Sequence, residues 1–252
     1  MMKKLSIFLV LSTLAVFLAA GNVQALPTID DGVFNPTEWA GYYASEDDVG
    51  PGGFVGPGWG GQAYDVEDLG LIITADKVYF GLQTGFDVTQ DSNNPATAPA
   101  KGPGDFALDV NGDGNYDYAI DFNIDTSTSN VTYSLYQVSS WEDVNYTTDP
   151  YDFSESNPFQ MKNGTLIGSW TDPGAYGYDS VSYVLEGAFD KSMLALYNGG
   201  KMTLHWTMWC GNDHLEQTSA PVPEPTTILL SGLGLLGMGC YLRKRSWRQK
   251  KA

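Results

Sequence analysis

The residues with the clearest chemistry form a short acidic run, Asp109-Val110-Asn111-Gly112-Asp113-Gly114-Asn115-Tyr116-Asp117. Oxygen-bearing side chains occupy its first, third, fifth and ninth positions, and a glycine stands sixth, where such a loop must turn sharply. Calcium takes roughly six to eight hard oxygen ligands, and this spacing supplies most of them. We therefore predict a structural Ca²⁺ site, with side-chain ligands from Asp109, Asn111, Asp113 and Asp117 and a backbone carbonyl from Asn115.

The flanks of this run separate it from an EF-hand. The twelfth position is Ile120 rather than Glu, and the residues after the loop alternate at period two, as in a strand. The loop resembles the calcium hairpins of FG-GAP repeats, which use the same nine positions. A single copy cannot build the propeller that those repeats form. The alternative is a polar turn without an ion, because Asn, Asp and Gly also favour tight turns.

Strands must hold this loop, and period-two alternation of apolar and polar residues predicts them. The alternating segments are 78–83, 116–125, 181–187 and 202–209, with further candidates at 69–74, 106–110, 131–141 and 165–170. The Gly- and Pro-rich segments 48–61 and 91–104 are predicted to be long surface loops. One short helix is expected at 191–197, capped by Asp190. The pattern predicts an all-β protein, a single antiparallel β-sandwich of jelly-roll-like type over residues 26–221.

The charge of the chain excludes some classes of partner. The formal net charge is −17. Between Leu26 and Pro221 there are five basic and 29 acidic residues. Nucleic-acid binding needs a basic footprint, so this composition argues against it. Adhesion to bare anionic lipid is disfavoured for the same reason.

The N-terminal segment 1–25 has the pattern of a secretory signal peptide. Lys3 and Lys4 precede a nearly continuous apolar run, Leu5–Ala20. Small residues at Val23 and Ala25 predict cleavage between Ala25 and Leu26. The alternative is an N-terminal anchor that is not cleaved.

The C-terminal segment 222–252 contains three features in order. Val222-Pro223-Glu224-Pro225 comes first, then the uncharged apolar run 226–242, and then a basic tail at 243–252 that begins Arg243-Lys244-Arg245. The apolar run is long enough for a transmembrane helix, and the positive-inside rule leaves the tail in the cytoplasm.

The order of these three features resembles the PEP-CTERM sorting signal. The resemblance implies a Gram-negative bacterium with an extracellular polysaccharide matrix. It also implies an exosortase partner that cleaves near the motif and releases or transfers the chain, which is held in the inner membrane until then. The alternative is a plain single-span anchor whose prolines only end the preceding loop.

Two stretches of the middle carry a resemblance of fold. Ile29-Asp30-Asp31-Gly32 with Glu38-Trp39, and the later segment 183–196, resemble carbohydrate-binding module family nine and the related DOMON-like sandwiches. One inserted Asp departs from the usual Ile-Asp-Gly, and the sugar-stacking tryptophans of that family do not align here. The runs 60–67 and 210–213 resemble exported PEP-CTERM proteins of unassigned role.

Aromatic residues in loops or at strand ends are the remaining candidates for binding. We name Trp59, Trp141, Tyr42 and Tyr43 as possible glycan contacts, because aromatic faces stack on sugar rings. The alternative for each is ordinary packing in the core or at an edge.

Other motifs of catalysis or metal binding are weak. The spacing of His205, Cys210 and His214 matches no zinc pattern. We expect His205 to be a surface or half-buried residue that forms hydrogen bonds, and Cys210 to be a buried small apolar residue. The acidic clusters 46–48 and 65–68 could supply a glycosidase pair or a second cation site, but we expect solvated loop charge there. The sequence has no nucleophile elbow, P-loop or His-Glu-x-x-His motif.

The sequence therefore predicts an exported, exosortase-processed protein of the cell surface or exopolysaccharide matrix. We expect a non-catalytic structural or adhesive component that Ca²⁺ stabilises. A glycan-binding module is the first alternative, and a secreted glycan-active enzyme is the second.

Overall fold

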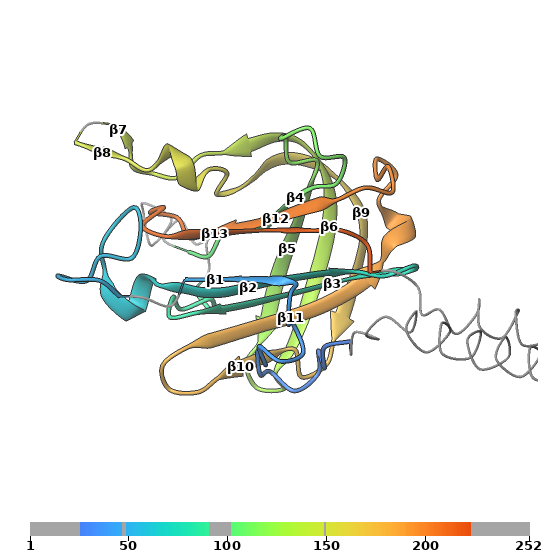
Figure 1. The fold of residues 1–252 in the computed structure, drawn as a ribbon, viewed down its shortest axis with the longest axis horizontal. Helices are drawn as coiled ribbons and strands as arrows, with labels where there is room; N and C mark the ends of the chain where they lie inside the picture. Colours follow the sequence, from blue (N-terminus) through green and yellow to red (C-terminus); the bar gives the residue numbers. More distant parts are fainter. Residues whose placement is uncertain (1–25, 47–48, 91–101, 149, 223–252) are drawn as a thin grey trace, which may run out of the picture. The chain divides into compact units, whose positions relative to one another are not determined.

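The computed structural model describes residues 26–46, 49–90, 102–148 and 150–222. The predicted signal peptide, the sorting motif from Pro223 onward, the apolar run and the basic tail lie outside the described residues. Residues Leu26–Val222 form one compact unit. Two antiparallel sheets pack face to face in this unit, which confirms the predicted all-β sandwich (Figure 1).

The first sheet has five strands in the order β1-β2-β3-β11-β10. Every neighbouring pair is antiparallel. The strands are β1 (Tyr43–Ser45), β2 (Val66–Ile73), β3 (Lys77–Thr84), β11 (Tyr183–Asp190) and β10 (Tyr176–Tyr178). Strand β3 pairs with β11, which lies about 100 residues later in the chain. The first sheet is therefore complete only after this long-range pairing has formed.

The second sheet has six strands in the order β13-β12-β4-β5-β6-β9. They are β13 (His214–Ser219), β12 (Met202–Thr207), β4 (Phe106–Asp109), β5 (Tyr118–Asp125), β6 (Asn130–Glu142) and β9 (Gln160–Asp172). Consecutive strands β4, β5 and β6 are antiparallel neighbours, and the acidic run lies in the connection from β4 to β5. A short separate hairpin, β7 (Thr147–Thr148) and β8 (Tyr151–Asp152), lies between β6 and β9.

The edge strand β9 is 13 residues long and mostly exposed. Its pairing with β6 is irregular at three places, between Leu135 and Tyr136, between Val138 and Ser140, and between Ser140 and Trp141. Such irregularities twist an edge and break the regular row of backbone groups that another strand would need.

The core lies between the two sheets and is rich in aromatic side chains. Phe80 on β3 is fully buried, and its ring centroid lies 5.1 Å from Phe106, 5.0 Å from Tyr133 and 6.3 Å from Phe189. Edge-to-face packing at these distances adds to the gain from burying apolar surface. The Tyr133 hydroxyl donates a 2.7 Å hydrogen bond to the carbonyl of Glu186 on the opposite sheet.

The N-terminal segment before β1 covers the outer face of the first sheet. Trp39 is fully buried and stacks on Phe34 at 5.3 Å. The indole lies against the backbone of β2 and β3, where a Cβ on Gly70 would approach it to 2.4 Å and one on Gly81 to 2.8 Å. This cover explains why every residue of β2 is buried, because both faces of that strand are packed.

The helix predicted at 191–197 is wrong. The chain makes only a single 3₁₀ turn at Lys191–Met193, and Asp190 makes no side-chain cap hydrogen bond. Asp190 is instead the last residue of β11, and its carboxylate forms a 3.4 Å ion pair with Lys77. The buried Leu194 belongs to the core between the sheets, so packing rather than helical periodicity places this segment.

The position of Phe80 allows a direct test of the core. Phe80→Ala should lower the free energy of unfolding by about 3–5 kcal/mol, because it removes a large buried ring and leaves a cavity between the sheets. Leu166→Ala is the control, since Leu166 is exposed on β9 and its loss should cost less than about 0.5 kcal/mol. Chemical denaturation of both variants measures the difference, and equal losses would contradict the position of the core.

Candidate functional site

The predicted calcium loop is the connection between β4 and β5. Asp109 ends β4, and Asp117 directly precedes β5. Gly112 and Gly114 have φ of +76° and +83°, a backbone conformation that glycine adopts without strain. Because both strands belong to the second sheet, the two ends of the loop are held at a fixed separation. The carboxylates of Asp109 and Asp117 therefore enter the same short turn.

Hydrogen bonds within the loop draw its oxygen atoms inward. The Asp109 carboxylate accepts from the backbone N–H of Gly112 at 2.7 Å and of Gly114 at 2.9 Å. Asp117 accepts from the Val110 N–H at 3.1 Å and from the Asn111 side chain at 3.3 Å. The structure thus brings Asp109, Asn111 and Asp117 together at the base of the loop.

Asp113 and Asn115 lie on the exposed side of the same loop. Asp113 accepts from the backbone N–H of Asn115 at 2.8 Å and from its side-chain amide at 3.1 Å. These hydrogen bonds lower the pKa of Asp113, whereas burial, and then the neighbouring Asp113 and Asp109 charges, raise the pKa of Asp117. In the described parts of the chain, no three His, Cys, Asp or Glu side chains converge closely enough to hold a metal ion.

The four aromatic residues named as possible glycan contacts do not share one surface. Tyr42 and Tyr43 are half-buried and pack on the cluster of Phe34 and Trp39. Trp141 lies on β6, and its indole donates a 3.0 Å hydrogen bond to the carbonyl of Tyr116. Trp59 alone stands largely clear of its neighbours, with 51% of its surface exposed.

Trp59 borders two hollows that share the lining residues Trp59, Tyr146 and Asn212. We call these two hollows together the aromatic groove. The first, of about 260 Å³, is completed by Tyr151 and Phe153. The second, of about 290 Å³, continues past Trp209 to Tyr64 and Phe86. Sequence reasoning named only Trp59 here, because the other walls come from segments far from it in the chain.

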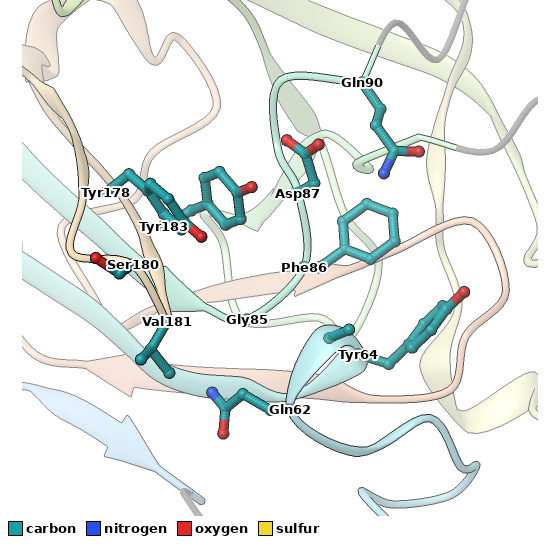
Figure 2. Close-up of a pocket in the computed structure, with 11 residues that line it drawn as sticks. Gln62, Tyr64, Gly85, Phe86, Asp87, Gln90, Tyr178, Ser180, Val181 and Tyr183 are labelled. Carbon is teal, nitrogen blue, oxygen red and sulfur yellow. The ribbon is translucent and has the colours of Figure 1, made fainter.

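A third hollow, of about 470 Å³, shares Tyr64, Phe86 and Gln90 with the groove. Figure 2 shows Tyr178 and Tyr183 on its far side, with Asp87 between them and Phe86. The rings of Tyr178 and Tyr183 are stacked at 4.4 Å. The three hollows thus meet at one end of the sandwich, where the hairpin of β7 and β8 and the loop before η1 (Gly61–Tyr64) also lie (Figure 1).

We expected solvated loop charge at 65–68, and the structure shows that this prediction is wrong. Asp65, Glu67 and Asp68 are buried. Glu67 accepts hydrogen bonds from the side chains of Gln62, Gln83 and Ser182. These contacts tie η1, β3 and Ser182, the residue before β11, to β2.

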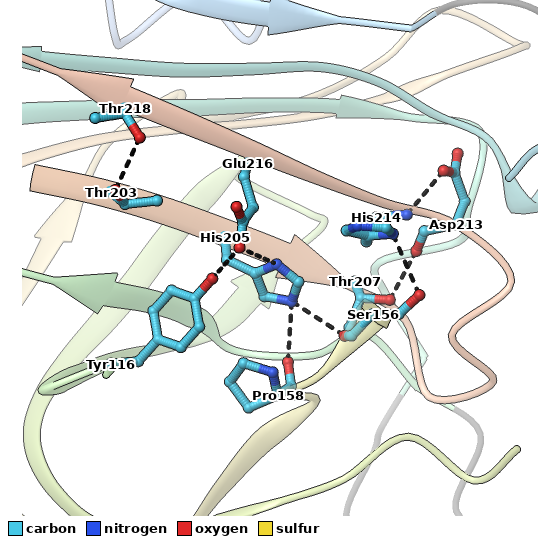
Figure 3. A network of polar contacts seen from close by, with 10 residues as sticks. All are labelled: Tyr116, Ser156, Pro158, Thr203, His205, Thr207, Asp213, His214, Glu216 and Thr218. Carbon is cyan, nitrogen blue, oxygen red and sulfur yellow. Dashed lines mark hydrogen bonds and ion pairs between the residues drawn. The ribbon is translucent and has the colours of Figure 1, made fainter. Parts of the chain in front are cut away.

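A second polar network is buried beneath the segment 154–159 (Figure 3). His205 on β12 is fully buried, and its Nε2 donates to the carbonyls of Ser156 and Pro158 at 3.1 and 3.2 Å. Its Nδ1 faces Glu216 at 3.8 Å, and Glu216 also accepts from the Tyr116 hydroxyl. We expected His205 at the surface or half-buried; the covering segment accounts for the difference.

Ser156 and His214 also belong to this network. The Ser156 hydroxyl donates to the carbonyl of Gly211 at 2.9 Å and lies 3.2 Å from Nδ1 of His214. Ser156 is fully buried, so no substrate reaches its hydroxyl, and the pair ties the 3₁₀ turn η3 (Ser154–Ser156) to β13. Cys210 is buried, as predicted.

Several buried ionisable groups are held in their neutral forms. Burial lowers the pKa of His205 to about 3. Burial raises the pKa of Asp213 to about 8 despite hydrogen bonds from the N–H groups of Val66 and His214. Burial likewise raises the pKa of Glu186 to about 8, helped by the nearby charge of Asp31. Burying these groups therefore destabilises the folded state least when the carboxyls are protonated and the imidazole is neutral.

Comparison with known proteins gives one match. The PEP-CTERM protein-sorting motif matches residues 221–245. The chain carries a PEP-CTERM sorting signal. This finding confirms the motif predicted at Val222-Pro223-Glu224-Pro225 with Arg243-Lys244-Arg245, and it implies export and exosortase-mediated surface sorting. No curated protein and no solved structure matches the chain.

The apolar run at 226–242 lies outside the described residues. Within the described residues, no helix has the length and hydrophobicity to cross a membrane.

The buried groups predict how stability depends on pH. The unfolded chain binds a proton on His205 below pH 6.5, its ordinary pKa, and the folded chain does so only near pH 3, so stability falls as the pH drops through this window. The folded chain keeps protons on Glu186 and Asp213 up to about pH 8, and the unfolded chain loses them near 4.5 and 3.8, so stability falls again as the pH rises toward 8. Above pH 4.5 the two carboxyls outweigh the single imidazole, so we expect maximum stability at about pH 4 to 4.5.

Glu186→Gln should flatten the alkaline side of this profile, because Gln is neutral at every pH. Its stability should equal that of the parent near pH 4, where Glu186 is protonated in both states, and exceed it at pH 9. Urea unfolding at several pH values in a chelator measures this, with the exposed Glu142→Gln as the matched control. A stability that rises steadily from pH 5 to 8 would contradict the assignment.

Proposed function

We propose that the protein is a non-catalytic structural or adhesive component of the cell surface or exopolysaccharide matrix. The observation that carries this proposal is the sorting signal at 221–245, because an exosortase substrate is delivered outside the cell. The compact, strongly acidic sandwich supports it, since a high net charge keeps a released protein soluble and separate from anionic lipid. The burial of Ser156, the one serine found beside a histidine in the described network, is consistent with a role without catalysis.

We further propose that Ca²⁺ stabilises the loop from Asp109 to Asp117. Its three carboxylates carry a charge of −3 and repel one another in a turn that both strands hold closed. A divalent cation would remove most of that repulsion, and its oxygen ligands would come from Asp109, Asn111, Asp113, Asp117 and the Asn115 carbonyl. This arrangement requires Asp113 to turn from Asn115 toward Asp109.

Calcium should therefore raise the melting temperature of residues 26–222. A Ca²⁺ concentration of one hundred times the dissociation constant stabilises a folded protein by roughly 2.7 kcal/mol, which shifts the transition by several degrees. Calorimetric titration with Ca²⁺ should show binding that Asp113→Ala abolishes. Asp125→Ala is the matched control, because Asp125 accepts from Ser127 in a similar turn without neighbouring ligands. Absence of binding by the parent would refute the calcium site.

The destination is tested in cells that make the full chain. Replacing Pro223, Glu224 and Pro225 by Ala should leave the chain in the membrane fraction with an intact C-terminus, because exosortase no longer processes it. The parent should appear in the surface or matrix fraction in shortened form. Fractionation with mass spectrometry measures both, and Glu142→Ala is the control. Matrix recovery of the motif variant at the parent level would contradict the proposal.

A further inference from the structure

The aromatic groove has a wall that is built to keep Trp59 in place. The loop that carries Trp59 is closed by backbone hydrogen bonds from Gly60 and Gly61 to the Gly53 carbonyl at 2.9 and 3.0 Å. The Phe54 ring meets Trp59 edge to face at 5.5 Å. The loop also contains a buried residue, Val55. Trp59 thus stays largely exposed on a rigid support rather than on a free tip.

The same loop is fastened to the floor of the groove. The Gly58 N–H donates a 2.7 Å hydrogen bond to the Asn212 carbonyl, and the Asn212 side chain donates to the carbonyl of Trp59. A Cβ on Gly58 would lie 2.7 Å from Cα of Asn212, so only glycine allows this approach. The orientation of Trp59 therefore depends on the contact between Gly58 and Asn212.

The opposite wall is a cluster of aromatic rings. Tyr146 lies 5.8 Å from Tyr151, 6.1 Å from Phe153 and 5.8 Å from Trp209, measured between ring centroids. Phe153 is buried with Val144 and Phe159, so it anchors this wall to the domain. Tyr151 keeps 48% of its surface exposed. Exposed aromatic residues held on rigid supports around one hollow mark a binding surface.

We propose that the aromatic groove binds a chain of neutral sugars. This inference rests on the proposed function, because it names the matrix component that the protein would hold. Aromatic faces accept the C–H faces of pyranose rings, and the amides of Asn212 and Gln90 at the edges match sugar hydroxyls. The third hollow, beyond Tyr64 and Phe86, extends the same surface for a longer chain.

Charge selects neutral sugars over acidic ones. Among the described residues that line the three hollows there is no Lys or Arg, and Asp87 contributes a carboxylate. The 29 acidic and five basic residues between Leu26 and Pro221 give this part of the chain a net negative charge, which repels uronic-acid polymers. A neutral polysaccharide is repelled neither by the Asp87 carboxylate nor by the net negative charge.

The test measures binding of neutral hexasaccharides to residues 26–222, a compact unit with its own core. Cellohexaose, laminarihexaose and mannohexaose are the neutral probes, and oligogalacturonate is the acidic probe. We expect at least one neutral probe to bind and to change tryptophan fluorescence. Trp59→Ala and Tyr151→Ala should each weaken that binding about tenfold or more, as expected for central aromatic contacts.

Gly58→Ala separates positioning from contact. It keeps every aromatic ring but pushes Trp59 away from Asn212, so binding should weaken by more than the accompanying loss of melting temperature explains, when compared with Leu166→Ala and Trp59→Ala at a temperature where all variants are folded. Trp141→Phe and Leu166→Ala are the controls, because neither residue lines a hollow at this end, and both should bind as the parent does.

Any of the following outcomes would overturn the inference. The first is that no neutral probe binds. The second is that Trp59→Ala and Tyr151→Ala bind as tightly as the parent does. The third is that oligogalacturonate binds more tightly than the neutral probes. Capture of a protein partner in place of sugar would also overturn it. The proposed function fails separately, when the full chain is absent from the surface and matrix fractions. A Trp59→Ala chain that is processed normally but washes out of the matrix supports both.

Discussion

The carboxylates of this domain have few cations to pair with, and the fold accommodates them through hydrogen bonds to its own backbone. Lys77 and Asp190 form an ion pair, but the common pattern is an aspartate that accepts the N–H two residues later. It recurs at Asp31, Asp87, Asp109, Asp113, Asp125, Asp152 and Asp179. These local bonds fix the turns between strands, so the acidic residues of the domain also shape its loops.

The same constraint explains what the sequence could predict. Alternation identified β3, β5 and β12, because one face of each meets the core and the other is more polar. It missed the full extent of β2, whose second face carries Ile72 and is covered by Phe34 and Trp39. A helix was predicted after Asp190, but the segment forms a single 3₁₀ turn at Lys191–Met193, which has too few residues to show a period.

The aromatic groove could not be predicted in full from a linear pattern. Trp59, Tyr146 and Asn212 come from three loops that are distant in sequence and that meet only when both sheets have formed. Of these residues, only Trp59 could be proposed from the sequence as a binding residue, because it is a large aromatic residue within a glycine-rich loop. The calcium loop is the opposite case, because its proposed ligands lie within nine consecutive residues and their spacing is visible directly. Local chemistry can be predicted from sequence, whereas a surface assembled from several loops needs the fold.

The irregular pairing of β9 with β6 has a consequence when many copies of the protein are present at high local concentration. Proteins delivered to the same surface are crowded together, and a long flat edge would let them join strand to strand into fibrils. The three irregularities in this ladder interrupt such a template, and Lys162 places a positive charge along it. The domain can therefore accumulate outside the cell as separate folded units, each free to turn its loops toward its surroundings.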